Sequence, residues 1–241
     1  MTIRLGMLTP SSNTVLEPTT AHMLAGLPDV TAHFQRFRVT RIALTADSLG
    51  QFDPAPITDA ARLLADAQMH AIAWNGTSAG WLGFDSDVRL CAAITTATAV
   101  PATSSVLALN EALRRLGVSR MALVTPYTAD VQARIIATYA AAGIEVVAER
   151  HLDDPGNFSF AQYDDATVAT LVREVAQARP QAIAVLCTNF RGAALAPALE
   201  AECGMPVLDS IAVTLWHALL LANVVPSRVQ GWGQVFSIVR E

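Results

Sequence analysis

The chain repeats its own pattern halfway along, and this internal repeat constrains the fold more than any other feature. Short runs rich in Ile, Val and Leu alternate with longer alanine-rich stretches of helical period, four times in each half. Such alternation is typical of βα units that feed a parallel sheet covered on both faces. We therefore predict an α/β protein of two pseudo-symmetric lobes, each a mainly parallel four-stranded sheet flanked by helices.

The pattern also places the elements. Strands are expected near 3–9, 30–38, 70–75, 100–104, 119–125, 145–151, 181–187 and 205–209, and helices near 14–26, 56–68, 86–98, 105–116, 128–142, 164–178, 192–203 and 210–224. The lobes are expected at 1–116 and 117–241, with the last helix free to pack on the first lobe. Asp164 and Ser210 are expected to cap the helices they precede.

Three pairs of motifs occur in the same order in both halves. Leu8 to Pro10 corresponds to Val124 to Pro126, Ala71 to Ser78 corresponds to Ala182 to Asn189, and Val100 to Ser105 corresponds to Met205 to Ser210. Ligands of open α/β sheets bind at the carboxyl ends of the strands. If a pseudo-twofold axis relates the halves, one cleft lies between them, and Gly76 and Cys187 occupy equivalent positions on opposite walls.

Composition excludes several classes of function. All sixteen basic residues are arginine, they form no run, and the net charge is −5, which argues against a nucleic-acid partner. Without lysine, Schiff-base chemistry and the lysine-dependent phosphate loop are excluded. No dinucleotide-binding or zinc motif occurs and the five histidines are scattered, so we expect no cofactor and no metal.

Location and assembly are also bounded by composition. Three cysteines cannot form a disulfide framework, and no basic segment precedes an apolar one at the N-terminus, so a cytoplasmic location is expected. The longest apolar run, 211–225, falls short of the roughly 20 residues of a membrane span and is interpreted as a buried helix. We expect no membrane partner, and apolar helices in an alanine-rich chain favour a homo-oligomer.

Gly76 to Gly80 matches G-x-S-x-G, the nucleophile elbow of α/β hydrolases, with Asp209 and His217 downstream. An elbow serine is followed at once by a helix, whereas the helical pattern after Ser78 restarts only beyond Asp85. A serine hydrolase is therefore kept as a lesser alternative. The same residues could serve as backbone N–H and hydroxyl donors to a carboxylate or enolate oxygen.

Cys187 ends an apolar strand and precedes a helix. A free cysteine is most often a small buried hydrophobe. The carboxyl end of a strand is, however, where a functional thiol is placed and its pKa adjusted. Cys91 and Cys203 fall within helices and are interpreted as structural.

Four groups of residues carry a family likeness: Pro10-Ser11-Ser12-Asn13-Thr14 with Glu17, Gly76-Thr77-Ser78, Thr125-Pro126-Tyr127, and Cys187-Thr188. Together they resemble the aspartate/glutamate racemase superfamily, specifically its arylmalonate decarboxylase and maleate isomerase branch. The likeness covers essentially the whole chain. It implies two pseudo-symmetric lobes, catalysis without cofactor or metal, and acid/base cysteines on opposite sides of a central cleft.

Gly76 departs from part of that pattern, because the family's racemases and maleate isomerases carry a cysteine there. The decarboxylase resembles this chain in having Gly-Thr-Ser at that position and one thiol on the second lobe. One thiol can protonate an enediolate from one face, whereas racemisation needs an acid/base group on each wall. Gly76→Cys is accordingly expected to permit racemisation.

The resemblance therefore implies a cofactor-free lyase acting on a small dicarboxylate of the malonate type. The implied catalytic residues are Cys187 as proton donor with Thr77, Ser78 and Tyr127 as donors to the enediolate. The implied substrate-binding residues are Ser12, Asn13, Gly76, Thr188 and Asn157. The alternatives are a maleate cis-trans isomerase or other isomerase of the family, the serine hydrolase, and a non-catalytic dicarboxylate-binding protein.

Overall fold

The computed structural model describes residues 2–45 and 50–238, and within them it forms two four-stranded sheets whose strand pairs are all parallel. The strands of the first sheet are β1 (Ile3–Pro10), β2 (Val30–Phe37), β3 (Ala71–Trp74) and β4 (Ala102–Ser104), and those of the second are β5 (Arg120–Thr125), β6 (Glu145–His151), β7 (Ala182–Val185) and β8 (Val207–Asp209). The order is β2-β1-β3-β4 in one and β6-β5-β7-β8 in the other. The predicted fold class is confirmed.

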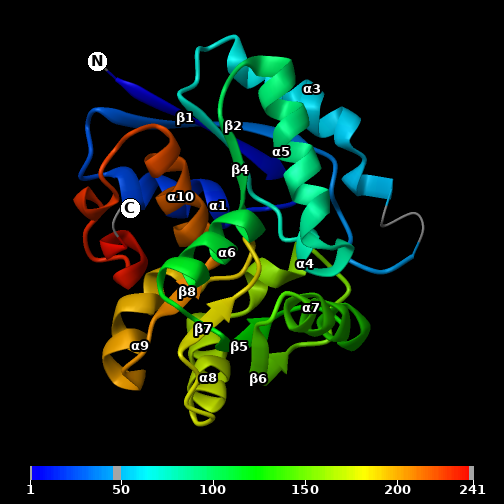
Figure 1. The fold of residues 1–241 in the computed structure, drawn as a ribbon, viewed down its shortest axis with the longest axis vertical. Coiled ribbons are helices and arrows are strands. Elements are labelled where there is room, and N and C mark those ends of the chain that lie inside the picture. The colour runs from blue at the N-terminus through cyan, green and yellow to red at the C-terminus, as the bar shows by residue number, and fades with distance from the viewer. Residues whose placement is uncertain (1, 46–49, 239–241) are drawn as a thin grey trace.

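Helices cover both sheets. They are α1 (Leu16–Leu24), α3 (Pro54–Ala65), α4 (Ala79–Leu82), α5 (Phe84–Thr98), α6 (Ser105–Arg115), α7 (Ala129–Ala141), α8 (Asp165–Ala176), α9 (Ala196–Cys203) and α10 (Ser210–Leu221). Figure 1 shows the first sheet with α3 and α5 in the upper half, and the second sheet with α7, α8 and α9 in the lower half. Strands β3 and β7, each in the interior of its sheet, are buried along their whole length, as expected for parallel sheets with helices on both faces.

The two halves repeat individual hydrogen bonds as well as the order of elements. The residue after β3 and the residue after β7 each donate a backbone N–H to the central strand, Asn75 to Leu8 at 3.0 Å and Leu186 to Val124 at 2.9 Å. The positions that follow, 76 and 187, are therefore equivalent in the two lobes, as the repeat predicts.

Helix α10 joins the halves. Nearly every side chain along it is buried, because it packs against α6, β3, β4 and α1 of the first half as well as β8 of its own. The apolar run was thus correctly interpreted as a buried helix, and no helix in the described ranges is long and apolar enough to cross a bilayer. The lobe boundary at 116/117 falls between α6 and β5 and stays a prediction.

Two local predictions need correction. Asp164 caps α8 as expected, accepting from the Thr167 N–H at 2.8 Å. For α10 the cap is Asp209 instead of Ser210, because the Asp209 carboxylate accepts from the N–H of Ile211 at 2.8 Å and Ser210 lies inside the helix.

The second correction is α4, a four-residue helix that begins directly after Ser78. Gly80 inside this helix and Gly83 directly after it made the sequence pattern typical of a loop. Tertiary packing overrides that signal: the missing Cβ of Gly80 lets α4 approach Ile135 and Leu186, where an added Cβ would already be 3.4 Å from each side chain.

Candidate active site

A small cavity lies where the carboxyl ends of the two sheets meet. It is lined by Pro10, Val39, Ile42, Phe52, Trp74, Gly76, Thr77, Ser78, Trp81, Tyr127, Asn157, Cys187 and Thr188. Its free volume, about 20 Å³, is enough for about one water molecule. The structure therefore brings together seven of the nine residues that the sequence predicts for the site: all four of the catalytic set, and Gly76, Asn157 and Thr188.

Cys187 sits two residues past β7 with its side chain buried. Its sulfur accepts the Asn189 N–H at 3.4 Å. Burial raises the pKa of the Cys187 thiol to about 12, and the nearby Tyr127 hydroxyl and the Asn189 N–H oppose the shift only in part. At neutral pH the group is a thiol, which is the protonation state that a proton donor needs.

Tyr127 connects that sulfur to the other lobe. Its hydroxyl lies 2.6 Å from the Thr77 hydroxyl. Burial, with the nearby Cys187 sulfur as a second cause, holds the pKa of Tyr127 well above its usual value, so the phenol keeps its proton. A chain of hydroxyl, phenol and thiol therefore runs from Thr77 in the first lobe to Cys187 in the second.

The high thiol pKa makes a prediction about alkylation. With a pKa of about 12, the thiolate fraction of Cys187 at pH 8 is about 10⁻⁴. We expect iodoacetamide to modify the partly exposed Cys203 well before Cys187, and the Cys187 rate to rise about tenfold per pH unit up to pH 10. Peptide mapping by mass spectrometry at several pH values separates the sites. Rapid alkylation of Cys187 at pH 7 would mean a resting thiolate and would contradict a proton-donor role.

Both strand ends offer backbone donors to the cavity. In the part of the chain that the structure describes, no atom accepts a hydrogen bond from the backbone N–H of Thr77, Ser78, Cys187 or Thr188, nor from the Ser78 hydroxyl. Unpaired N–H groups in successive residues form a concave site for an anion. The repeat thus places one such pair on each wall, and together they can hold a carboxylate or a developing enediolate oxygen.

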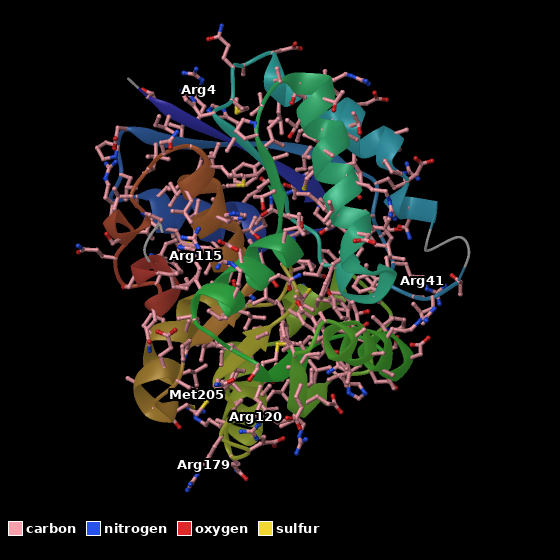
Figure 2. All side chains as sticks on the ribbon, viewed as in Figure 1. Arg4, Arg41, Arg115, Arg120, Arg179 and Met205 are labelled. Carbon is pink, nitrogen blue, oxygen red and sulfur yellow. The ribbon has the colours of Figure 1, made fainter. Side chains whose placement is uncertain are left out.

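The rest of the lining is apolar. Phe52, Trp81 and Tyr127 stack edge to face, with ring centroids 5.8 and 5.3 Å apart, and Val39 and Ile42 complete this side. Among the described residues that line the cavity, none is charged. Arginines lie outside it, as the separated positions of Arg4, Arg41 and Arg179 at the edges of the molecule illustrate (Figure 2). An anion in the cavity is therefore held by neutral donors.

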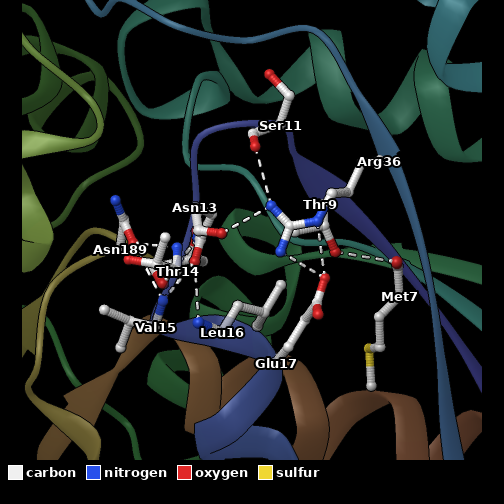
Figure 3. A network of polar contacts seen from close by, with 11 residues as sticks. Met7, Thr9, Ser11, Asn13, Thr14, Val15, Leu16, Glu17, Arg36 and Asn189 are labelled. Atoms are coloured by element: carbon white, nitrogen blue, oxygen red, sulfur yellow. Dashed lines mark hydrogen bonds and ion pairs between the residues drawn. The ribbon is translucent and has the colours of Figure 1, made fainter.

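Ser12 and Asn13 occupy other positions than the sequence suggested. The Asn13 amide donates to the Thr188 carbonyl at 3.0 Å, and its oxygen accepts from the Leu16 N–H at 2.9 Å (Figure 3). The Ser12 hydroxyl donates to the Val39 carbonyl at 2.8 Å. Neither residue lines the cavity, so their predicted substrate contacts stay predictions, and in this arrangement they position the residues that do line it.

Asn189 is a positioning residue that the sequence did not single out. Its oxygen accepts from the Thr14 N–H at 2.9 Å (Figure 3). Its amide donates to the Asn157 carbonyl at 2.6 Å. It thereby caps the start of α1 from the opposite lobe and holds Asn157, which lines the cavity. In the sequence, only its correspondence to Ser78 in the internal repeat could have indicated that Asn189 lies near the site.

We expect Asn189→Ala to destabilise the fold by about 2–3 kcal/mol, because it leaves buried N–H and carbonyl groups without partners. The corresponding loss of Tm is roughly 5–10 °C. Thr138→Ala is the matched control, since that hydroxyl donates to a helix carbonyl on an exposed surface and its loss should be nearly neutral. Equal Tm values for both variants would contradict the assigned role.

The structure removes one argument against a serine hydrolase and supplies a stronger one. Because α4 follows Ser78 directly, the absence of a helix after the serine no longer counts against an elbow. His217, however, bonds to the Thr103 hydroxyl at 2.7 Å, and Asp209 is occupied as the cap of α10. Neither lines the cavity that holds Ser78, so the described residues contain no Ser-His-Asp arrangement there.

Comparison with known proteins gives the family. The sequence model of the arylmalonate decarboxylase family matches residues 5–236, nearly the whole chain. The chain belongs to the arylmalonate decarboxylase family. An arylmalonate decarboxylase of Bordetella bronchiseptica is 30% identical over 183 residues, covering 75% of this chain and 76% of that protein. A maleate isomerase of Geobacillus stearothermophilus is 27% identical over 237 residues, 92% of each.

Solved structures give the same result. The unliganded structure of an arylmalonate decarboxylase superposes with a TM-score of 0.80 at 26% identity, covering 97% of this chain and 99% of that one. A maleate cis-trans isomerase of Nocardia farcinica bound to TRIS superposes with a TM-score of 0.88 at 24% identity over 97% of each chain, which shows a shared fold. The family resemblance inferred from the motifs is confirmed, and the relatives are enzymes of two kinds.

Proposed function

We propose that the protein is a lyase of the arylmalonate decarboxylase type that acts on a small malonate-like dicarboxylate. The bond between the α-carbon and one carboxylate breaks, carbon dioxide leaves, and the electron pair passes to the remaining carboxylate as an enediolate. Cys187 then gives its proton to the α-carbon. The resulting thiolate is a strong base, in line with its raised thiol pKa, and regains a proton from water.

The observation that carries the proposal is the asymmetry of the two walls. Cys187 stands on one side as a buried thiol, and the equivalent position on the other side is Gly76, which has no side chain. A single donor is enough to protonate an enediolate but not to exchange a proton between two faces. The unpaired N–H groups of both strand ends support the same reading, because they are suited to the charge that develops on the enediolate oxygens.

The apolar side of the cavity supports loss of carbon dioxide. A carboxylate beside Val39, Ile42 and Phe52 is poorly solvated, whereas the neutral carbon dioxide formed from it is not penalised there. The other carboxylate, among the N–H and hydroxyl donors, gains charge as the bond breaks. This difference between the two ends of the diacid favours the transition state over the bound substrate.

A maleate isomerase-type reaction is the second candidate, favoured by the name of several relatives. A mutant of the Nocardia farcinica isomerase has been solved with a covalently bound succinylcysteine intermediate. Addition of sulfur to a double bond needs a thiolate. Cys187 would have to supply it alone from a resting thiol with a pKa of about 12, so we rank this reaction below decarboxylation.

A substrate panel tests the proposal. We expect carbon dioxide release from a malonate with one α-substituent, and proton NMR in deuterium oxide should show one deuterium at the α-carbon of a single enantiomer. Conversion of maleate to fumarate without carbon dioxide release would instead support the isomerase. A diacid that binds without turnover of any compound would support a binding protein. The predicted homo-oligomer and cytoplasmic location stay predictions.

A further inference from the structure

The wall opposite Cys187 is filled by an aromatic ring. A Cβ built on Gly76 would lie 1.9 Å from Cζ2 and 2.2 Å from Cε2 of Trp74. Trp74 is the last residue of β3, is fully buried, and packs against Phe37 with the two rings tilted by 45° and their centroids 4.9 Å apart. The six-membered edge of the indole therefore occupies the space that a side chain at position 76 would take.

Comparison of the two lobes shows that the large and the small side chain have changed places. In the second sheet the residue that pairs like Trp74 is Val185, since Trp74 pairs with Leu8 and Ser104 as Val185 pairs with Val124 and Asp209. Val185 is smaller than Trp74, and the position two residues later has a side chain, that of Cys187. In the first sheet the large residue comes first and glycine follows.

The indole also presents an unused donor. In the described ranges, the buried Nε1–H of Trp74 has no hydrogen-bond acceptor. Trp216, by comparison, donates its Nε1–H to the Ile238 carbonyl at 3.2 Å. Most buried polar groups are paired, so an unpaired one on the wall of a ligand cavity calls for an explanation. Trp81, which lines the same cavity, has an unpaired Nε1–H as well.

We propose that Trp74 determines specificity: its ring limits the α-substituent of the substrate to a small group, and its Nε1–H donates to an oxygen on that substituent. The preferred class is thus a malonate with a small, oxygen-bearing α-substituent, such as hydroxymalonate. Substrates with an aryl substituent are excluded. This inference rests on the proposed function for the malonate core, and on the Trp74 geometry for the substituent.

The size limit follows from the cavity itself. Trp74 lines the cavity and its ring fills the space beside Gly76, where an added Cβ would already lie 1.9 Å from it, so this wall has no room for a phenyl substituent. Thr77, Ser78, Tyr127 and Thr188 supply donors for carboxylate oxygens. The Trp74 ring lies beside Gly76, the position equivalent to Cys187, so a substituent of the α-carbon that points away from Cys187 would meet this ring.

Three malonates of graded chemistry test the proposal: hydroxymalonate, methylmalonate of nearly equal size, and phenylmalonate. Affinities are measured by titration calorimetry, independently of carbon dioxide release. For the unmodified protein we expect hydroxymalonate to bind about 3- to 10-fold more tightly than methylmalonate, the effect of one hydrogen bond, and phenylmalonate to bind at least about tenfold more weakly than methylmalonate.

Two variants separate the parts of the proposal. Trp74→Phe keeps a ring over Gly76 and removes the donor, so it should abolish the preference for hydroxymalonate while still excluding phenylmalonate. Trp74→Ala should admit phenylmalonate and reverse the size preference, with Trp74→Leu in its place if the alanine variant fails to fold by circular dichroism. Trp81→Phe removes the other unpaired indole N–H of the same lining and so tests which of the two donors acts; if Trp74 is the donor, this variant keeps the preference for hydroxymalonate.

Binding of phenylmalonate by the unmodified protein as tightly as methylmalonate, or an unchanged ratio in the folded Trp74→Ala or Trp74→Leu protein, would overturn the size limit. Loss of the hydroxymalonate preference in Trp81→Phe instead of Trp74→Phe would overturn the role of the Trp74 donor. If the affinity ratios behave as expected but no malonate releases carbon dioxide, the proposed function fails and this inference stands. If carbon dioxide is released but the affinity ratios are the same with and without Trp74, the proposed function stands and this inference fails.

Discussion

Cys187→Ala should lower kcat/KM for decarboxylation by about 10²–10⁴-fold, the usual contribution of a positioned proton donor. The stereochemistry should change as well. Without the thiol, the enediolate is protonated by water from either face, and the small amount of product that forms should be close to racemic. Carbon dioxide release gives the rate, and, for the reaction run in deuterium oxide, proton NMR with a chiral shift reagent gives the ratio of the two α-monodeuterated enantiomers.

Other variants separate this role from a general disturbance of the fold. Cys91→Ala removes a buried thiol from α5, outside the cavity lining, and should leave rate and stereochemistry unchanged. Ser78→Ala removes one donor to the enediolate and should cost about 10²–10³-fold in kcat with the product still a single enantiomer. Complete loss in Ser78→Ala together with an active Cys187→Ala would favour the hydrolase and contradict the proposal.

The paired positions on the two walls could be predicted because they depend on local order that the sequence repeats. Apolar runs in the same sequence in each half fix two sheets of the same topology, and the residue two places beyond β3 or β7 then has to reach the shared edge. Gly76 and Cys187 follow from this argument alone. β7 nevertheless ends two residues earlier than predicted, because the chain leaves the ladder once Leu186 has donated to Val124.

Contacts between the lobes could not be predicted in the same way. Asn13 lies in a motif that suggested a carboxylate contact, yet its amide is used by the Thr188 carbonyl of the other lobe. Asn189 holds the start of α1 across the same boundary. Polar side chains after a strand can bind a ligand, cap a helix or bridge two lobes, and residue type alone does not distinguish these uses.

The role of Trp74 could be predicted in part. Residues two apart on a strand point to the same face, so a large residue at 74 and glycine at 76 could have indicated that one ring covers the other position. Sequence alone did not give the direction in which the indole turns. That direction changes what Gly76→Cys alone is expected to do, because the new Cβ would meet the ring at 1.9 Å.

Gly76→Cys alone should therefore destabilise the protein by about 1–3 kcal/mol, as overpacking of a buried site commonly does, and should gain little racemase activity. Gly76→Cys combined with Trp74→Ala removes the ring and leaves room for a thiol opposite Cys187. One thiol, once ionised, can then take the α-proton of an α-substituted acid while the other returns a proton to the opposite face. We expect the double variant to racemise such an acid at least about tenfold faster than Gly76→Cys.

Proton NMR in deuterium oxide distinguishes the outcomes, because racemisation by two thiols incorporates solvent deuterium with inversion, and polarimetry of each enantiomer follows it directly. Trp74→Ala alone is the control: it has the added space but one thiol, so it should not racemise. Deuterium found only with retention in the double variant would mean that positions 76 and 187 do not face each other. A folded Gly76→Cys protein that racemises as fast as the double variant would mean that the indole moves aside readily, and Trp74 would then not be the residue that limits this wall.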